Sequence, residues 1–305
     1  MKRSTQWFFQ EGRKLDDYSL FDFLHGYVYA RWPYLYIGIG LGEHPIAKAF
    51  MHVRSMVSRR QPTEQTQNKK KGGMADTYHG KVLLPESAHT LVRVQKDIDL
   101  RDLEHVIPYP IARDIVLKNP DHIVVLECPC RSVREDPCLP LDVCMIIGEP
   151  FASFVLEHHT ERSRPLSREQ AVRLLEQERE RGHVHHAFFK DAMLGRFYAI
   201  CNCCSCCCGA IQSVRNGNPM LTSSGYLAHV DESRCIGCAN CLEVCNFDAL
   251  RIENGVITII DAKCMGCGIC VEACLEGALR LEREPTKGVP LEIVKLMDAS
   301  VATQG

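Results

Sequence analysis

The chain has 305 residues, of which 46% are hydrophobic and 24% charged, so most of it should fold around a core, with room for two domains. Its net charge is only −2, but residues 1–75 carry twelve Lys/Arg against six Asp/Glu, and residues 231–282 carry four against nine. The eighteen cysteines disfavour a secreted disulfide scaffold, because the chain is long, shows no cleavable signal peptide and spaces most cysteines two or three residues apart. We therefore expect a reducing, cytoplasmic location and thiols that bind metal.

Residues 1–57 form an aromatic and basic N-terminal arm. Its centre, FLHGYVYARWPYLYIGIGLG from Phe23 to Gly42, is about long enough to span a bilayer, but Pro33 should break a helix near its middle. Two alternatives stay open. The arm packs on a partner subunit or on the protein's own core, which we favour, or residues 20–57 contact a membrane surface. The rings that suit both settings are Tyr27, Tyr29, Trp32, Tyr34 and Tyr36.

Residues 58–77 are polar and charged and predict a flexible linker. Residues 78–225 predict a small α/β domain, with a short helix at PIARDIVLKNP (residues 110–120), because prolines lie at its first turn and beyond its end. HIVVLE (122–127) predicts a buried strand. SREQAVRLLEQERERG predicts a helix whose capping box is formed by Ser167 and Gln170. HVHHAFF and RFYAI predict two further strands.

Residues 229–282 contain an internal repeat, since an offset of 29 residues aligns all eight of their cysteines. The two units, CIGCANCLEVC and CMGCGICVEAC, share the spacing C-x2-C-x2-C-x3-C. Three thiolates at this spacing can wrap one face of an iron–sulfur cubane, and the fourth must come from elsewhere. Gly237, Gly266 and Gly268 should let the backbone curl tightly around the sulfurs. Residues 283–305 follow as a C-terminal tail.

These motifs resemble the bacterial-type two-[4Fe–4S] ferredoxin domain, which has an α+β fold. The resemblance implies one cluster on Cys235, Cys238, Cys241 and Cys274, and a second on Cys264, Cys267, Cys270 and Cys245. Ferredoxins usually have proline after the last cysteine of each motif, whereas this chain has Asn246 and Leu275. A fully cysteine-ligated cluster passes single electrons, and the acidic balance nearby favours basic redox partners.

Ten cysteines remain outside the repeat: Cys128, Cys130, Cys138, Cys144, Cys201, Cys203, Cys204, Cys206, Cys207 and Cys208. ECPCR follows the strand HIVVLE directly, and CNCCSCCCG follows the strand RFYAI directly. If these strands are parallel neighbours, the two cysteine loops meet at one edge of the sheet. Adjacent cysteines cannot all point the same way in an extended chain, so some of the ten should reach a second centre or be bystanders. Arg131 and Arg134 could balance the charge of a thiolate-rich centre.

Three interpretations of the middle cysteines stay open. We favour one or two further iron–sulfur clusters over a thiolate-bound zinc or copper ion, and both over metal-free redox dithiols. The whole pattern CPCR…CNCCSCCC resembles the region upstream of ferredoxin modules in poorly characterised iron–sulfur proteins of anaerobes, a resemblance that implies no reaction. His183 and His185 are expected to be structural, because cysteine ligands are already in excess.

The sequence therefore predicts an α/β cysteine-rich domain followed by a ferredoxin domain, acting together as an iron–sulfur electron-transfer protein. Its expected partner is another redox protein or a larger oxidoreductase complex. The alternative is a redox enzyme with a substrate-binding cluster in the middle domain, although the sequence specifies no catalytic residue. A redox or metal sensor is the second alternative, and it is disfavoured because no nucleic-acid-binding module is visible.

Overall fold

The computed structural model describes residues 1–45 and 77–304. The end of the N-terminal arm and residues 58–76 of the predicted linker lie outside the described residues.

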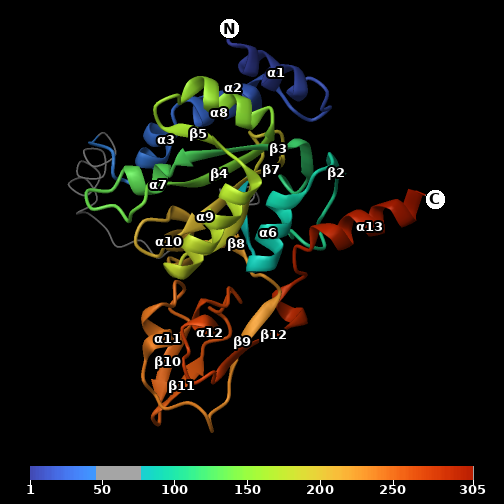
Figure 1. Cartoon of the computed structure of the whole chain (residues 1–305). Coiled ribbons are helices and arrows are strands. Elements are labelled where there is room, and N and C mark those ends of the chain that lie inside the picture. The colour runs from blue at the N-terminus through green and yellow to red at the C-terminus, as the bar shows by residue number, and fades with distance from the viewer. Residues whose placement is uncertain (46–76, 305) are drawn as a thin grey trace, which may run out of the picture.

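An eight-stranded sheet forms the centre of the molecule (Figure 1). Its strands follow the order β2-β3-β4-β7-β6-β1-β8, with β5 paired to the second half of β3. Neighbouring strands are antiparallel except for β1 and β8. The strands are β1 (Tyr78–Val82), β2 (Ile98–Leu100), β3 (Ile115–Glu127), β4 (Asp142–Glu149), β5 (Ser163–Leu166), β6 (Val184–Lys190), β7 (Arg196–Cys203) and β8 (Leu221–Thr222).

The prediction of a short helix at residues 110–120 is wrong, because β3 begins inside that segment. The β-branched Ile115 and Val116 pair with β2 and are buried, so pairing outweighs the local proline signals. Pro120 is tolerated within β3 because pairing with β4 is interrupted between Lys118 and Ile123.

The other predicted elements of the middle domain are confirmed. HIVVLE is the second half of β3, and HVHHAFF and RFYAI lie largely in β6 and β7. Helix α9 (Arg168–Glu180) begins at the capping box. The backbone N–H of Gln170 donates to Ser167 Oγ, and the backbone N–H of Ser167 donates to Gln170 Oε1.

The assumption that β3 and β7 are neighbours is wrong, because β4 lies between them. Since β4 is antiparallel to both, β3 and β7 still run in the same direction. Their carboxyl ends, each followed by a cysteine loop, therefore lie at the same edge of the sheet.

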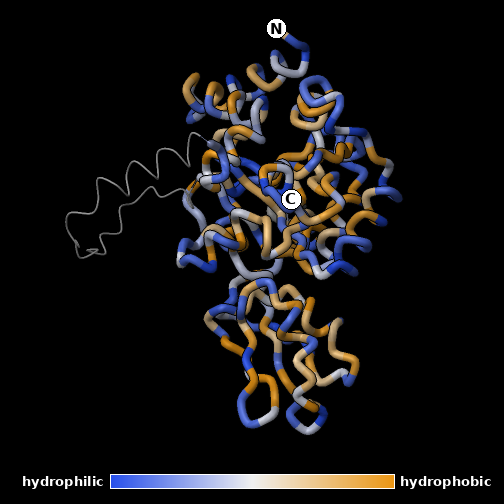
Figure 2. Tube along the Cα trace, turned by 90° about the vertical axis from the view of Figure 1, so that its left-hand side faces the viewer, coloured by the Kyte–Doolittle hydropathy of each residue, from blue (hydrophilic) through white to orange (hydrophobic). Residues whose placement is uncertain are grey.

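Helices cover both faces of this sheet, and Figure 2 shows hydrophobic stretches gathered toward the centre of this part of the molecule. Buried side chains of one face come from α1 (Arg3–Gly12), α2 (Leu20–Arg31), α8 (Phe151–His158) and α10 (Gly209–Arg215). Those of the other face come from α6 (Pro85–Arg93), α9 and α13 (Ile293–Gln304). The short helices α3 (Pro33–Gly40) and α7 (Pro129–Ser132) pack on each other beside the first cysteine loop.

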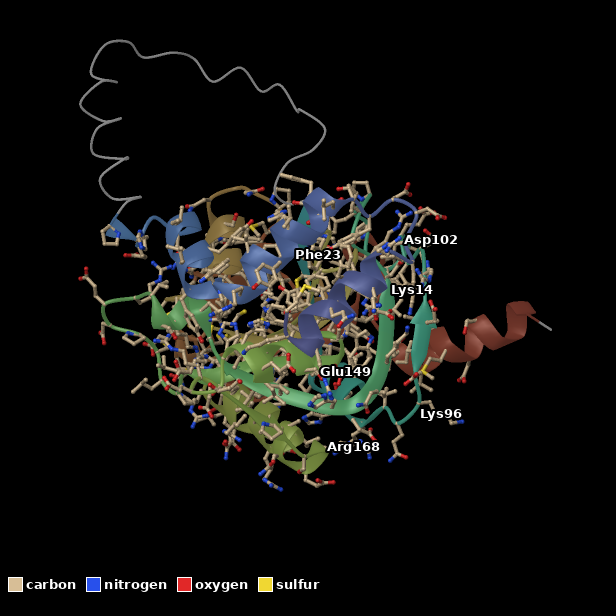
Figure 3. The ribbon with its side chains drawn as sticks, turned by 90° about the horizontal axis from the view of Figure 1, so that it is seen from above. Lys14, Phe23, Lys96, Asp102, Glu149 and Arg168 are labelled. Carbon is tan, nitrogen blue, oxygen red and sulfur yellow. The ribbon has the colours of Figure 1, made fainter. Side chains whose placement is uncertain are left out.

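The N-terminal arm packs on the protein's own core. Phe8 is fully buried, and the Phe8 and Phe23 rings meet edge to face at 5.3 Å between centroids. Figure 3 shows Phe23 among these helices, seen from above the sheet. The helix break predicted at Pro33 is confirmed, since α2 ends at Arg31 and α3 begins at Pro33. Within residues 1–45 and 77–304, no helix is long and apolar enough to cross a membrane.

The C-terminal repeat lies on one side of the sheet domain (Figure 1). It contains β9 (Tyr226–Val230) paired with β12 (Leu279–Arg283), β10 (Leu250–Glu253) paired with β11 (Val256–Ile259), and the short helices α11 (Asn240–Glu243) and α12 (Ile269–Glu272). The segment predicted as a tail returns to the sheet domain, where α13 packs on α6 and β2 and buries Ile293.

Gly26 is where α2 comes closest to the sheet domain. A Cβ at this position would lie 2.0 Å from the Ala192 carbonyl oxygen, so the helix must move if the glycine is replaced. We expect Gly26→Ala to destabilise the protein by about 1–3 kcal/mol, the usual cost of overpacking, and to lower the midpoint of anaerobic thermal unfolding by several degrees. Gly40→Ala is the matched control, because nothing lies within 4 Å of its Cβ position. Equal midpoints for the two variants would contradict this packing.

Candidate metal centres

The eight cysteines of the repeat line two separate small cavities. One is lined by Cys245, Cys264, Cys267 and Cys270, and the other by Cys235, Cys238, Cys241 and Cys274. Each set takes three thiols from one repeat unit and the fourth from the other unit. These are the two groupings that the ferredoxin resemblance implies.

The backbone around both cavities fits thiolate ligands of an iron–sulfur cluster. Amide N–H groups donate to the sulfurs of Cys245 (3.4 Å, from Ala249) and Cys274 (3.2 Å, from Ala278), as expected where sulfur carries negative charge. Gly266 has a φ of +62°, and a Cβ there would lie 2.1 Å from the Tyr226 carbonyl oxygen. The predicted tight curl is confirmed at all three glycines, which have positive φ. A soft four-thiol donor set with N–H···S bonds suits a [4Fe–4S] cluster at each cavity.

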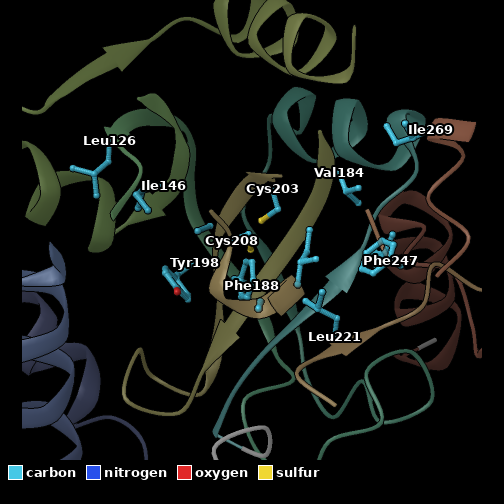
Figure 4. Packing of buried hydrophobic residues seen from close by; sticks show 14 of the residues in the cluster. Leu126, Ile146, Val184, Phe188, Tyr198, Cys203, Cys208, Leu221, Phe247 and Ile269 are labelled. Atoms are coloured by element: carbon cyan, nitrogen blue, oxygen red, sulfur yellow. The ribbon is translucent and has the colours of Figure 1, made fainter. Parts of the chain in front are cut away.

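The middle cysteines surround a much larger cavity of about 340 Å³ at the carboxyl ends of β3 and β7. Seven of the ten line it: Cys128, Cys130, Cys144, Cys201, Cys203, Cys204 and Cys208. Figure 4 shows Cys203 and Cys208 close together beside Tyr198 and Phe188, which also line the cavity. The structure thus places both cysteine loops around one largely apolar pocket.

Six of these thiols form a set that we call the six-thiol site: Cys128, Cys144, Cys203 and Cys208, which are buried, and Cys130 and Cys201, which are partly buried. Hydrogen bonding from Cys130 and Cys144 holds the pKa of the Cys128 thiol well below its usual value. The hydrogen bond with Cys128 correspondingly raises the pKa of Cys144, which also contacts Cys201. Cys128, Cys130, Cys144 and Cys201 thus lie in hydrogen-bonding contact, and such a group of soft sulfur donors suits a thiolate-bound metal.

The other four thiols form a second group, which we call the four-thiol site: Cys138, Cys204, Cys206 and Cys207. Their sulfur atoms all lie within 4.8 Å of one another, and Cys138 Sγ is 2.8 Å from Cys206 Sγ. Cys206 and Cys207 belong to this group, whereas Cys208 pairs with Cys203 in the six-thiol site. The consecutive cysteines therefore point in different directions, as their spacing predicts.

Arg131 ties the two cysteine loops together from inside the protein. Its buried guanidinium donates to Glu178 Oε2 (2.8 Å) and to the carbonyl oxygen of Asn202 (3.0 Å), which lies between two cysteines of β7. Burial opposes ionisation of Glu178, but the hydrogen bond with His183 and the charge of Arg131 outweigh it and hold the pKa of Glu178 below its usual value. His183 thus completes a buried hydrogen-bond network with Glu178 and Arg131, as a structural residue would.

Tyrosines of the N-terminal arm form part of the cavity wall. The hydroxyl groups of Tyr29 and Tyr198 are 2.7 Å apart, and the Lys190 ammonium lies 5.2 Å from the centroids of the Tyr29 and Tyr78 rings. Tyr34 donates to the carbonyl oxygen of Glu127, immediately before the first cysteine loop. The arm therefore closes the six-thiol site from one side.

Asn246 connects the repeat to the second cysteine loop, and the sequence marked it only as a departure from proline. Its side-chain oxygen accepts from the Ser205 N–H (2.9 Å), and its side-chain nitrogen donates to the carbonyl oxygen of Gly182 (2.8 Å). Arg179 adds a second link, since it donates to the Cys267 carbonyl oxygen (2.7 Å) and pairs with Glu272. The residues around the cavity of Cys245 and Cys267 are thus hydrogen-bonded directly to the middle domain.

Comparison with known proteins agrees with the identity of the C-terminal part. Residues 228–281 match the family model described as a 4Fe-4S dicluster domain. No curated protein matches the chain. The chain therefore carries a ferredoxin-type 4Fe–4S domain near its C-terminus, preceded by a mixed α/β domain with its own cysteine cluster.

Replacing Asn246 should loosen the second cysteine loop. Asn246→Ala removes the acceptor for the Ser205 N–H and one donor to Gly182, and each lost hydrogen bond costs about 1 kcal/mol. We expect amide hydrogen exchange in residues 201–208 to accelerate by roughly tenfold, measured by mass spectrometry on the anaerobic protein. Asn240→Ala, at the exposed first residue of α11, is the control. Unchanged exchange in the Asn246 variant would show that this bridge does not hold the loop.

Proposed function

We propose that this protein transfers single electrons between a redox partner and an iron–sulfur centre in its own middle domain. Cys235, Cys238, Cys241 and Cys274 would hold one [4Fe–4S] cluster, and Cys245, Cys264, Cys267 and Cys270 the other. Each cluster would supply one-electron transfer without an open iron for substrate. The six-thiol site would hold the third centre.

The observation that carries this proposal is that the two cysteine cavities of the repeat have different surroundings. Asn246 and Leu275 occupy equivalent positions, 29 residues apart, after the last cysteine of each motif. Asn246 is 5% exposed and contacts the middle domain, whereas Leu275 is 87% exposed. Ile236 and Leu242 are likewise exposed, while their equivalents Met265 and Val271 are half-buried. The side chains beside the cavity of Cys245, Cys264, Cys267 and Cys270, which we call the inner cavity, are thus covered by the protein itself. Those beside the other cavity, which we call the outer cavity, are exposed.

The surroundings of the outer cavity have the features of a docking face for a redox protein. Exposed apolar side chains flank the cysteines of the outer cavity, and Glu276 lines that cavity. The net charge of residues 231–282 is negative, with nine acidic against four basic residues. A partner with a basic, partly apolar face is therefore favoured, because opposite charges speed the encounter and apolar contacts hold it.

The cavity over the six-thiol site favours a second candidate function, a redox enzyme with a substrate at the middle centre. Its volume of about 340 Å³ lies within the range of small-molecule pockets, and its lining is mainly apolar and aromatic. Six thiols also exceed the four that one cubane needs. In this alternative the ferredoxin domain still transfers single electrons, and it supplies them to the middle centre for reduction of the substrate.

Contact of residues 20–57 with a membrane surface stays a prediction. It is supported by exposed apolar side chains on α2 and α3: Leu20, Phe21, Leu24, Val28, Trp32, Leu35 and Ile39.

The metal content tests the middle centre. Two ferredoxin clusters account for about eight irons per chain, so we expect the anaerobically purified protein to contain about twelve. Cys128→Ser, which removes the thiol shared by Cys130 and Cys144, should lose about four irons and leave the ferredoxin EPR signals unchanged. Cys245→Ser is the comparison and should instead lose iron from the repeat. A wild type with about eight irons, unaffected by Cys128→Ser, would contradict the proposal.

Truncating the exposed apolar residues tests the docking face. We expect Ile236→Ser with Leu275→Ser to slow electron transfer from the reduced protein to cytochrome c, a basic one-electron acceptor, by about five- to tenfold. Reduction of the same variant by dithionite, a small molecule, should be unchanged. Ile111→Ser, at an exposed isoleucine of the sheet domain, is the matched control. Equal rates for the double variant and the control would exclude this face.

A further inference from the structure

The four-thiol site differs in kind from the cavities of the ferredoxin domain. Cys138 comes from the loop between α7 and β4, and Cys204, Cys206 and Cys207 come from the turn between β7 and α10. None of the four forms a disulfide, although Cys138 Sγ and Cys206 Sγ are only 2.8 Å apart. Four ionised thiols this close together would repel one another, so a positive charge is needed among them to hold them as thiolates.

The distances between the sulfurs indicate whether a single metal ion or a cluster supplies that charge. Four sulfurs around one tetrahedral ion with bonds of about 2.3 Å lie about 3.8 Å from one another. The sulfurs of the four-thiol site are all within 4.8 Å, and those of Cys206 and Cys207 are 3.7 Å apart. Those of Cys138 and Cys206 are 2.8 Å apart and would move apart by about 1 Å on binding the ion. The outer thiolates of a cubane lie further apart, because each one binds a separate corner iron. The four-thiol site therefore fits one ion better than a cluster.

The groups around the four thiols fix them in place. The Cys138 N–H points at Cys207 Sγ (3.5 Å), and Gln212 donates to the carbonyl oxygen of Cys206 (2.8 Å). Arg134 donates to the carbonyl oxygen of Cys207 (3.1 Å) and to Gln212 Oε1 (2.7 Å). Such outer contacts orient metal ligands, and Arg134 is itself held in place by an ion pair with Glu43 (2.6 Å). Cys206 is exposed, so an ion can reach the site from solvent.

We propose that Cys138, Cys204, Cys206 and Cys207 bind a single tetrahedral divalent metal ion, zinc or iron(II), apart from any iron–sulfur cluster. All four positions are filled by protein, which is the arrangement of a closed structural or electron-transfer site. The ion would clamp the loop that carries Cys138 onto the turn after β7. This inference does not rest on the proposed function, since a closed metal site is compatible with a carrier or an enzyme.

The full metal and sulfide inventory tests the proposal. Because [4Fe–4S] clusters contain equal iron and acid-labile sulfide, the ion should appear as about one equivalent of zinc, or of iron in excess of sulfide, per chain. X-ray absorption at the edge of that metal should show four sulfurs at about 2.3 Å. Zinc and excess iron both support the site, and the measurement tells which ion fills it.

Cys138→Ser should remove this equivalent and leave the iron–sulfur content and EPR signals unchanged. Cys206→Ser, at an exposed thiol, should do the same and covers the case in which the first variant does not fold. Ser205→Ala, in the same turn, is the control and should keep the ion. Equal loss of iron and sulfide in either cysteine variant would overturn the proposal, because the thiols would then belong to a cluster. A wild type with neither zinc nor excess iron, even after anaerobic incubation with zinc chloride, would also overturn it.

Discussion

The antiparallel strand β4 fixes the position of the cysteines in the middle domain. It pairs with β3 on one side and with β7 on the other, so both of these strands end at the edge where β4 begins. Cys144 lies near that end of β4, opposite Leu126 of β3. Three segments of the chain therefore deliver thiols to one pocket, and the arm and Arg131 line its wall.

The two units of the repeat share one local structure, but the residues that follow their last cysteines have different surroundings. Both halves have the same cysteine spacing and the same positive-φ curl, so both fit the same cluster. The difference lies at the position after the last cysteine, where Asn246 binds the middle domain and Leu275 faces solvent. An asparagine at this position supplies hydrogen bonds that a proline, with no N–H and no polar side chain, could not make. The inner cavity is thereby joined to the second cysteine loop, whereas the equivalent residue beside the outer cavity is exposed.

Much of the chemistry could be predicted from the sequence because it is local. The cysteine spacing identified the ferredoxin domain, and the capping residues Ser167 and Gln170 located α9. The pairing of distant strands could not be predicted, so residues 110–120 were assigned to a helix and β3 to the wrong neighbour. The division of ten thiols into six and four depends on where Cys138 lies, 68 residues before Cys206 in the chain. Asn246 carried a local signal, its departure from proline, but its contacts with Gly182 and Ser205 are long-range.

We propose that an iron–sulfur centre in the six-thiol site lies close to the inner cavity, because Asn246, next to Cys245, bonds to the second cysteine loop. Low-temperature EPR of the fully reduced protein tests this most directly, because paramagnetic centres that are close together broaden each other's signals. We expect the signal of the cluster in the inner cavity to be broadened in the wild type and to narrow in Cys128→Ser, while the signal of the cluster in the outer cavity changes little. Identical spectra for the two proteins would show that no such centre lies close to the inner cavity.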